Sequence, residues 1–255
     1  AALFPMEVIS VGIMYYAALV PCVFSAFIGE HISVLMGVRT LTAPYPVEEV
    51  PKFYGIAWGK AILLAICFAF AGALFCVMLH IFEKQLKKWF QNPYLRVFVG
   101  GVTVVLLWKI TGTDTYLGLG GGTIAQSFAE PQKLWVFLLK ILFTCITLCS
   151  GFKGGEIVPS LFIGATLGSA LAPIFGMPVD ICAACGMVGV FCAVTNSPIS
   201  SLLIAFELFG FAGMPYFCTV IAVSYLLSGY QSLYKAQKIV YSKTENKYID
   251  RNTTS

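Results

Sequence analysis

Seven apolar runs, separated by short polar stretches, dominate the chain. They cover residues 8–29, 62–81, 97–110, 134–149, 157–177, 181–204 and 211–229. An upright helix needs about 20 apolar residues to cross a bilayer, and several of these runs are shorter or interrupted by proline, as at Pro159 and Pro198. Broken helices are tolerated at membrane depth only where they are buried in protein or line a cavity. The pattern predicts an all-α integral membrane protein with tilted and broken helices, a permease rather than a simple anchor.

Composition supports a membrane protein and excludes several other classes. Of the 255 residues, 58% are hydrophobic and only 11% are charged. A disordered chain, a coiled coil or a nucleic-acid-binding domain needs more charge, so we expect a lipid bilayer and not nucleic acid as the surroundings. Cys182 and Cys185 form a CxxC pair, but no histidine or second pair lies nearby. We therefore expect no metal site and no cofactor.

Basic residues predict the orientation. One group lies between the second and third apolar runs, and another follows the last run: Lys84, Lys87, Lys88 and Arg96, then Lys235, Lys238, Lys243, Lys247 and Arg251. The positive-inside rule places both groups in the cytoplasm, so the C-terminus is expected there and the plasma membrane is the expected location. Residues 38–61 are predicted to be an extracellular linker, and residues 235–255 a cytoplasmic C-terminal helix and tail.

The two ends of the chain match at a separation of 200 residues. The matched pairs are Leu3 with Leu203, Glu7 with Glu207, Met14 with Met214, Tyr16 with Tyr216, Val20 with Val220, Val23 with Val223 and Gly29 with Gly229. Internal repeats, often inverted, are typical of secondary transporters. Residues 1–37 are then the end of a first inverted repeat, and 62–234 a complete second repeat. Because the first copy has nothing before it, we expect the chain to be a fragment.

A glycine-rich stretch offers candidate chemistry. Residues 150–165 contain Gly154, Gly155 and Pro159 ahead of an apolar run, which predicts a helix start at 154–165. A helix N-terminus inside a membrane presents unpaired N–H groups, and these bind an anion without a full positive charge. A tight turn before an ordinary transmembrane helix explains the spacing equally well. A second glycine cluster at 118–122 follows no strand and is not a dinucleotide-binding loop.

Three blocks in order carry a resemblance to a known family. They read Gly-Glu-Ile-Val-Pro at 155–159 with Gly164 and Gly168 beyond, Phe-Cys-Ala-Val-Thr-Asn-Ser-Pro-Ile at 191–199 with Glu207 beyond, and Gly-Tyr-Gln-Ser-Leu-Tyr at 229–234. Together they resemble the CLC family of chloride channels and transporters, over nearly the whole chain. The resemblance implies inverted-repeat architecture and a homodimer with one anion pathway per subunit. It also implies anion contacts at Gly155, Glu156, Ile157, Val158 and Tyr234, although without it Tyr234 reads as an interfacial anchor.

Two departures from the family pattern bear on the ion. Ile157 replaces the usual phenylalanine, and Glu156 precedes it. A carboxylate beside an anion must turn away, pair with Lys153 or take a proton, unless it only complements the helix dipole. A glutamate here resembles the fluoride/proton antiporter branch, which makes Glu156 a candidate for proton handling. Val8 occupies the place where chloride/proton exchangers carry a proton-relay glutamate, with Glu7 one residue before.

The sequence therefore predicts anion transport of the CLC type, moving chloride or fluoride, with a preference for fluoride/proton antiport. A chloride channel or a chloride/proton exchanger is the alternative. An intramembrane enzyme is disfavoured because no HExxH or GxSxG motif is present, and a nonfunctional fragment is a further alternative. Asn196 and Ser197, which precede Pro198, are predicted to cap a helix.

Overall fold

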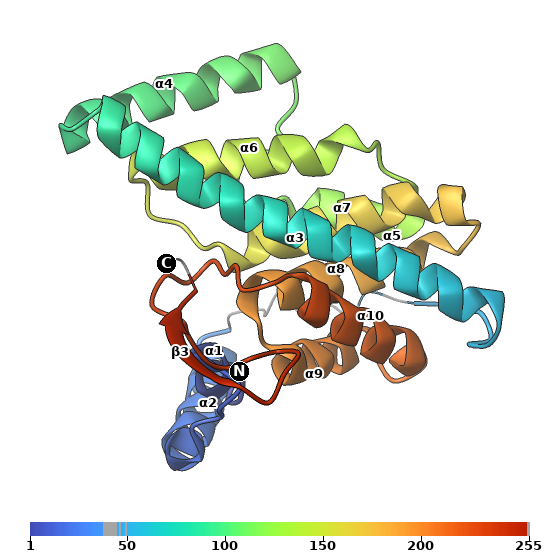
Figure 1. Ribbon diagram of the computed structural model, residues 1–255. Coiled ribbons are helices and arrows are strands. Elements are labelled where there is room, and N and C mark those ends of the chain that lie inside the picture. Colours follow the sequence, from blue (N-terminus) through green and yellow to red (C-terminus); the bar gives the residue numbers. More distant parts are fainter. Residues whose placement is uncertain (38–44, 46, 49, 254–255) are drawn as a thin grey trace.

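The computed structural model describes residues 1–37, 45, 47–48 and 50–253, and helices form most of this part (Figure 1). The helices are α1 (Phe4–Val8), α2 (Leu19–Leu35), α3 (Ile56–Trp89), α4 (Pro93–Thr111), α5 (Gly121–Ala129), α6 (Trp135–Ser150), α7 (Ile157–Phe175), α8 (Val179–Thr195), α9 (Pro198–Phe209) and α10 (Met214–Leu227). Four of the described segments are long and apolar enough to cross a membrane: Tyr16–Leu35, which adds a 3-10 turn to α2, and α3, α4 and α7. The predicted helical membrane architecture is confirmed.

The core is the pair of helices α7 and α8, which the short turn at 176–178 joins. Their backbones touch through glycine. A Cβ on Gly164 would lie 2.2 Å from the carbonyl oxygen of Gly186, and a Cβ on Gly168 would lie 2.1 Å from that of Cys182. Membrane helices pack closely where small residues face each other, because lipid supplies no hydrophobic force to press larger ones together. This contact fixes where α7 begins.

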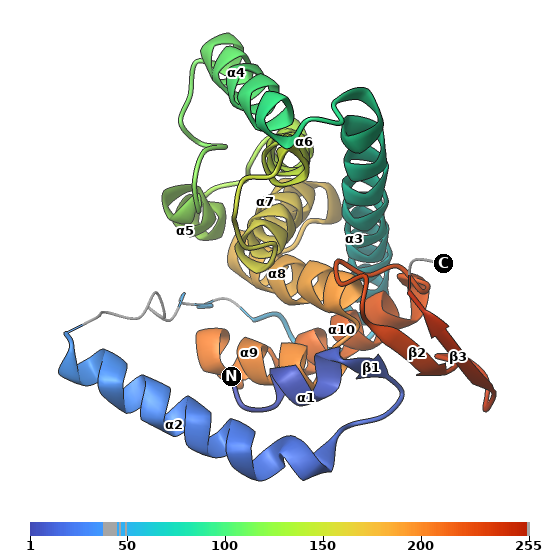
Figure 2. The ribbon, with the colours of Figure 1, turned by 90° about the vertical axis from the view of Figure 1, so that its left-hand side faces the viewer.

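The long helix α3 crosses this core and packs against α8, α10 and α6 (Figures 1 and 2). Phe68 and Phe75 are fully buried in that contact. Helix α4 lies at the edge against α6 and buries only Gly100, while apolar side chains such as Phe98 and Ile110 stay exposed. Exposed apolar faces of this kind suit contact with lipid.

The start of α3 differs from the predicted boundary. The linker prediction covers 38–61, of which 38–44, 46 and 49 lie outside the described residues. Residues 56–61, however, already belong to α3. Lys60 extends the helix rather than ending it, because its Nζ donates to the carbonyl oxygen of Gly176 at 3.3 Å. The apolar run alone could not show this partner.

Helix α9 takes its cap from a distant residue. The Glu7 carboxylate accepts hydrogen bonds from the amides of Ile199 and Ser200 at 2.9 and 2.8 Å, and from the Ser200 hydroxyl at 2.6 Å. Ser197 occupies the predicted N-cap position of α9, but neither its side chain nor that of Asn196 caps the helix. Asn196 ends α8 in a left-handed conformation with φ of 57°, and the Ser197 hydroxyl donates to the Thr195 carbonyl instead.

The predicted C-terminal helix within 235–255 is also wrong. Strands β2 (Lys238–Tyr241) and β3 (Tyr248–Asn252) pair antiparallel, and β2 pairs parallel with β1 (Ser10–Val11), in a three-stranded sheet (Figure 2). β-Branched and aromatic residues at 239–241 favour a strand. Between the strands, the half-buried Lys243 donates from its ammonium to the Tyr225 carbonyl at 2.9 Å and to the Ser228 hydroxyl at 3.0 Å. This contact ties the hairpin to the end of α10.

We predict that Glu7→Ala lowers stability by about 2–3 kcal/mol, because it leaves buried donors of Ile199 and Ser200 without an acceptor. The matched control is Glu207→Ala at the partner position of the proposed repeat, which is exposed and should change stability by less than about 0.5 kcal/mol. Thermal unfolding in detergent micelles measures both variants. Equal midpoints for the two would contradict a capping role.

Candidate anion site

The start of α7 presents unpaired backbone donors. Helix α6 ends at Gly151, whose φ of 109° turns the chain into the loop 151–156, and α7 begins at Ile157. The first amide to find an acceptor within α7 is that of Ser160, which donates to the Glu156 carbonyl at 3.2 Å. Pro159 has no N–H. Within the described residues, the amides of Glu156, Ile157 and Val158 have no hydrogen-bond acceptor.

The site lies at the edge of the buried core. Gly155 is exposed, while Glu156, Ile157 and Val158 are half-buried, and α7 is almost wholly buried from Pro159 onward. An anion can therefore approach the three free amides from the loop side, and the helix macrodipole adds a partial positive charge there. The missing side chain at Gly155 leaves room, since a Cβ added there would meet no atom within 4 Å.

Glu156 sits at the N-cap position of α7 without capping it. Its carboxylate has no hydrogen bond or ion pair among the described residues, so the pairing with Lys153, one of the alternatives that the sequence left open, is not formed. Burial raises the pKa of Glu156, the negative charge of Glu83 raises it further, and Lys235 opposes both. The neutral, protonated form is therefore easier to reach than for an ordinary glutamate.

Tyr234 is held beside this carboxylate by the chain that follows α10. The amide of Leu233 donates to the Val194 carbonyl at 3.0 Å, and the Tyr234 carbonyl accepts from the Thr253 hydroxyl at 3.1 Å. Tyr234 is half-buried against the core. Burial raises the pKa of its phenol, and the charge of Glu156 raises it further. The hydroxyl therefore remains a neutral hydrogen-bond donor.

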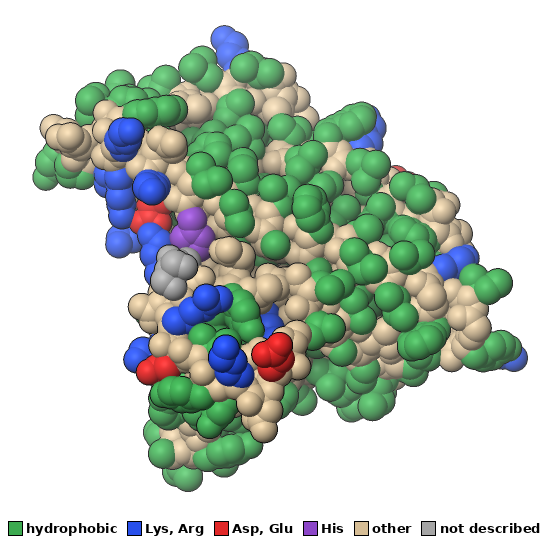
Figure 3. Space-filling model, in the orientation of Figure 1, with side chains coloured by type: hydrophobic (Ala, Val, Ile, Leu, Met, Phe, Trp, Pro, Cys, Tyr) green, Lys and Arg blue, Asp and Glu red, His purple; other side chains and the backbone are tan. Residues whose placement is uncertain are grey.

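Glu83, near the end of α3, connects the site to a basic surface. Its carboxylate forms ion pairs with Lys87, at 2.6 Å, and with Lys235, the residue after Tyr234. Basic side chains gather at this end of α3 and over the C-terminal strands, while most of the same face is apolar (Figure 3). The arrangement combines free amides, a phenol and a protonatable carboxylate, which together can bind an anion and hold a proton.

A family model described as voltage gated chloride channel matches residues 1–229. The chain belongs to this CLC family. It is an integral membrane protein, as the family and the long apolar helices show.

Two relatives of this CLC chain are informative. The "Chloride/fluoride channel protein" of Pseudomonas syringae pv. tomato (strain ATCC BAA-871 / DC3000) is 36% identical over 248 residues, which is 95% of this chain and 54% of that protein. The crystal structure of a CLC-type fluoride/proton antiporter superposes with a TM-score of 0.86 at 32% identity, covering 93% of this chain and 60% of that one. The chain spans a little over half the length of both relatives.

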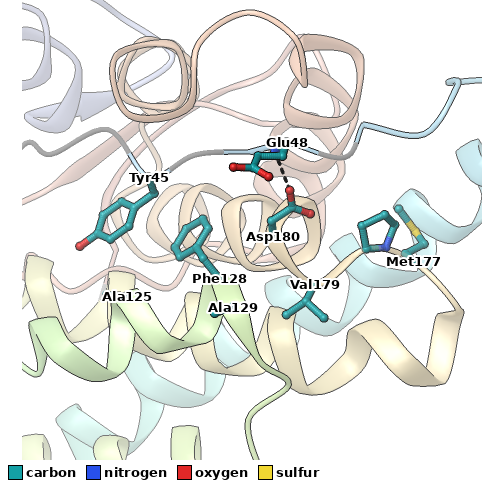
Figure 4. Close-up of a pocket in the computed structure, with 9 residues that line it drawn as sticks. Tyr45, Glu48, Ala125, Phe128, Ala129, Met177, Val179 and Asp180 are labelled. Carbon is teal, nitrogen blue, oxygen red and sulfur yellow. Dashed lines mark hydrogen bonds between the residues drawn. The ribbon is translucent and has the colours of Figure 1, made fainter.

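A separate cavity of about 660 Å³ lies between α5, the α7–α8 turn and the side chains of Tyr45 and Glu48 (Figure 4). Tyr45 stacks on Phe128 with ring centroids 4.7 Å apart, and the amide of Glu48 donates to the Asp180 carboxylate at 2.7 Å. This cavity shares no residue with the predicted anion site. The described residues contain no group of three or more histidine, cysteine or acidic side chains able to hold a metal ion.

Sequence reasoning missed Glu83 and Lys235 as neighbours of the site. Both lie in polar stretches that the sequence shows only as a basic cluster. The sequence could have indicated Lys235 alone, because this residue directly follows Tyr234, which is a predicted anion contact. The ion pair between them spans 152 residues, so nothing local in the sequence could predict it.

We predict that Glu83→Gln lowers the pKa of Glu156, because it removes a nearby negative charge and frees Lys235 from its ion pair. At a given pH, Glu156 then binds fewer protons. Infrared spectroscopy across a pH series measures this directly, with the Glu156 band assigned as the one lost in Glu156→Gln. Glu130→Gln, at an exposed loop position, is the control. A midpoint that stays in place or rises in Glu83→Gln would show that the two carboxylates do not interact.

Proposed function

We propose that the complete protein carrying this chain transports halide ions across a membrane, and that it exchanges fluoride for protons. The observation that carries the proposal is the start of α7, where three free amides lie beside a protonatable glutamate. The relatives named as a chloride/fluoride channel protein and as a fluoride/proton antiporter support the same activity.

Gly155, Glu156, Ile157, Val158 and Tyr234 are proposed to bind the anion. The amides and the phenol supply hydrogen bonds without a full positive charge. Binding of this kind is strong enough for a halide to enter and weak enough for it to leave.

Glu156 is proposed to carry the proton. Fluoride is the base of a weak acid, so a protonatable group beside it is chemically reasonable. The other candidate position supports this assignment. Val8 has no ionisable group, and both oxygens of the neighbouring Glu7 accept hydrogen bonds from α9. Protons therefore need a route other than the one expected near Val8, and Glu156 supplies it.

The alternative is a chloride channel or a chloride/proton exchanger. The relative named as a chloride/fluoride channel protein favours it, because that printed name covers both ions and a channel. The same amides and phenol would bind chloride. The alternative differs from the fluoride proposal in whether Glu156 carries the proton.

Placement in the membrane and assembly complete the proposal. The basic groups at the end of α3 and after α10 lie on one side, which we assign to the cytoplasm of the plasma membrane together with the C-terminus. Helix α2 buries no residue and stands apart from the core (Figure 2), with Phe24 and Phe27 exposed. Such a face needs lipid or protein against it, and we propose a homodimer.

We predict that the complete protein, reconstituted in liposomes, moves fluoride together with opposite proton movement, and that Glu156→Gln stops the proton movement while fluoride still passes. A fluoride electrode and a pH electrode follow the two ions. Glu130→Gln is the control and should behave like the unchanged protein. Chloride efflux as fast as that of fluoride, with no proton movement, would contradict the fluoride proposal and support the chloride alternative.

We predict that Tyr234→Phe weakens halide binding about tenfold, because it removes one hydrogen bond to a charged ligand. Equilibrium titration with sodium fluoride in detergent measures the affinity. Tyr94→Phe, at a tyrosine that is 85% exposed, should leave it unchanged. If Tyr234→Phe binds as tightly as the unchanged protein, the phenol is an anchor and not a ligand.

A further inference from the structure

Lys140 is a buried cation in the middle of α6. The residue is only 1% exposed. Its ammonium donates to the carbonyl oxygens of Tyr116 and Gly118, at 3.2 and 2.9 Å, and lies 4.7 Å from the ring centroid of Phe162. The glycine cluster at 118–122 makes these contacts possible. A Cβ on Gly120 would lie 2.6 Å from the Phe162 ring, so only glycine lets the loop close over the lysine.

No carboxylate neutralises this charge. In the part of the chain that the structure describes, the ion pairs are those of Glu83 with Lys87 and Lys235, and Lys140 has none. Carbonyl dipoles and an aromatic face stabilise a cation but do not cancel its charge. An ammonium has three N–H donors, and the two carbonyls account for two of them. One donor and one full charge remain for a ligand.

A cavity borders both Lys140 and the loop that precedes α7. It has a volume of about 310 Å³ and is lined by Lys140, Thr144, residues 116–119, Gly154, Gly155 and Pro159, among others. Gly155 directly precedes Glu156, so the lining of the cavity reaches the residue next to the free amides of α7. Its volume equals the share of about ten water molecules, which leaves room for a small ion that keeps part of its hydration shell.

We propose that this cavity is a second anion site, in which the Lys140 ammonium holds a halide before it reaches the start of α7. The identity of the anion as a halide rests on the proposed function. An isolated charge at membrane depth is costly, and a mobile anion is the partner that can offset it without blocking the route. The same cation attracts anions toward the cavity, because Coulomb interactions extend far in a medium of low dielectric constant.

The first test separates charge from structure. Lys140→Gln keeps donors for the two carbonyls but removes the charge, and Lys140→Arg keeps the charge. In liposomes containing the complete protein, we expect Lys140→Gln to raise the half-saturating fluoride concentration about tenfold while the maximal rate changes less than about twofold. Lys140→Arg stays near the unchanged protein. Lys109→Met, which removes an exposed lysine from α4, is the control for net charge and leaves both quantities unchanged.

The second test needs neither transport nor a variant. Crystals of the complete unchanged protein are grown in sodium bromide, whose anomalous scattering locates the ion. A bromide peak within hydrogen-bond distance of the Lys140 Nζ supports the site even if no ion flux is found, so the two proposals can fail separately. A peak at the start of α7 with none at Lys140 would overturn the second site. So would an unchanged half-saturating concentration in folded Lys140→Gln, because the lysine would then only tie down its loop.

Discussion

A helix that begins inside an apolar core leaves backbone N–H groups without acceptors, and the structure of this chain depends on how two such helix starts are satisfied. Burial makes an unpaired donor costly, and lipid offers it no water. Helix α9 begins at Pro198, and α7 contains Pro159 in its first turn. In α9, the Glu7 carboxylate accepts the first amides. In α7, the corresponding donors remain free for a ligand.

The two helix starts differ in where the nearby glutamate comes from and in which donors it accepts from. Glu7 comes from a helix 192 residues away and enters the start of α9, which closes that end against an anion. Glu156 belongs to α7 itself, and its carboxylate receives no hydrogen bond from any described residue. Burial without a hydrogen-bond donor favours the protonated form of a carboxylate and raises the pKa of Glu156. Glu7 therefore stabilises the start of α9, whereas Glu156, at the start of α7, has no partner and remains available for the proposed proton binding.

Much of the fold could be predicted from the sequence, because long apolar runs in a chain with little charge can only be membrane helices. The break near Pro198 and the start of α7 after Gly155 were visible for the same local reason. What could not be predicted depends on long-range pairing. Glu7 reaches α9, Lys243 reaches the end of α10 and Glu83 reaches Lys235, across separations that no local pattern records. The C-terminal strands were mistaken for a helix because their pairing with β1 is equally distant.

The charges of Lys140 and Glu156 act on the same part of the chain. Both border the loop that contains Gly154 and Gly155, one with a positive charge and the other with a negative charge that a proton removes. An anion bound in this loop, as proposed, is attracted by Lys140 and repelled by ionised Glu156. Anion occupancy and protonation of Glu156 must then favour each other at equilibrium, by equal free energies. This coupling brings proton and anion to one place but sets no direction. In the proposed exchange, the direction of each ion depends on the side of the membrane toward which it can leave, and therefore on motion of the elements around α7 rather than on the charges themselves.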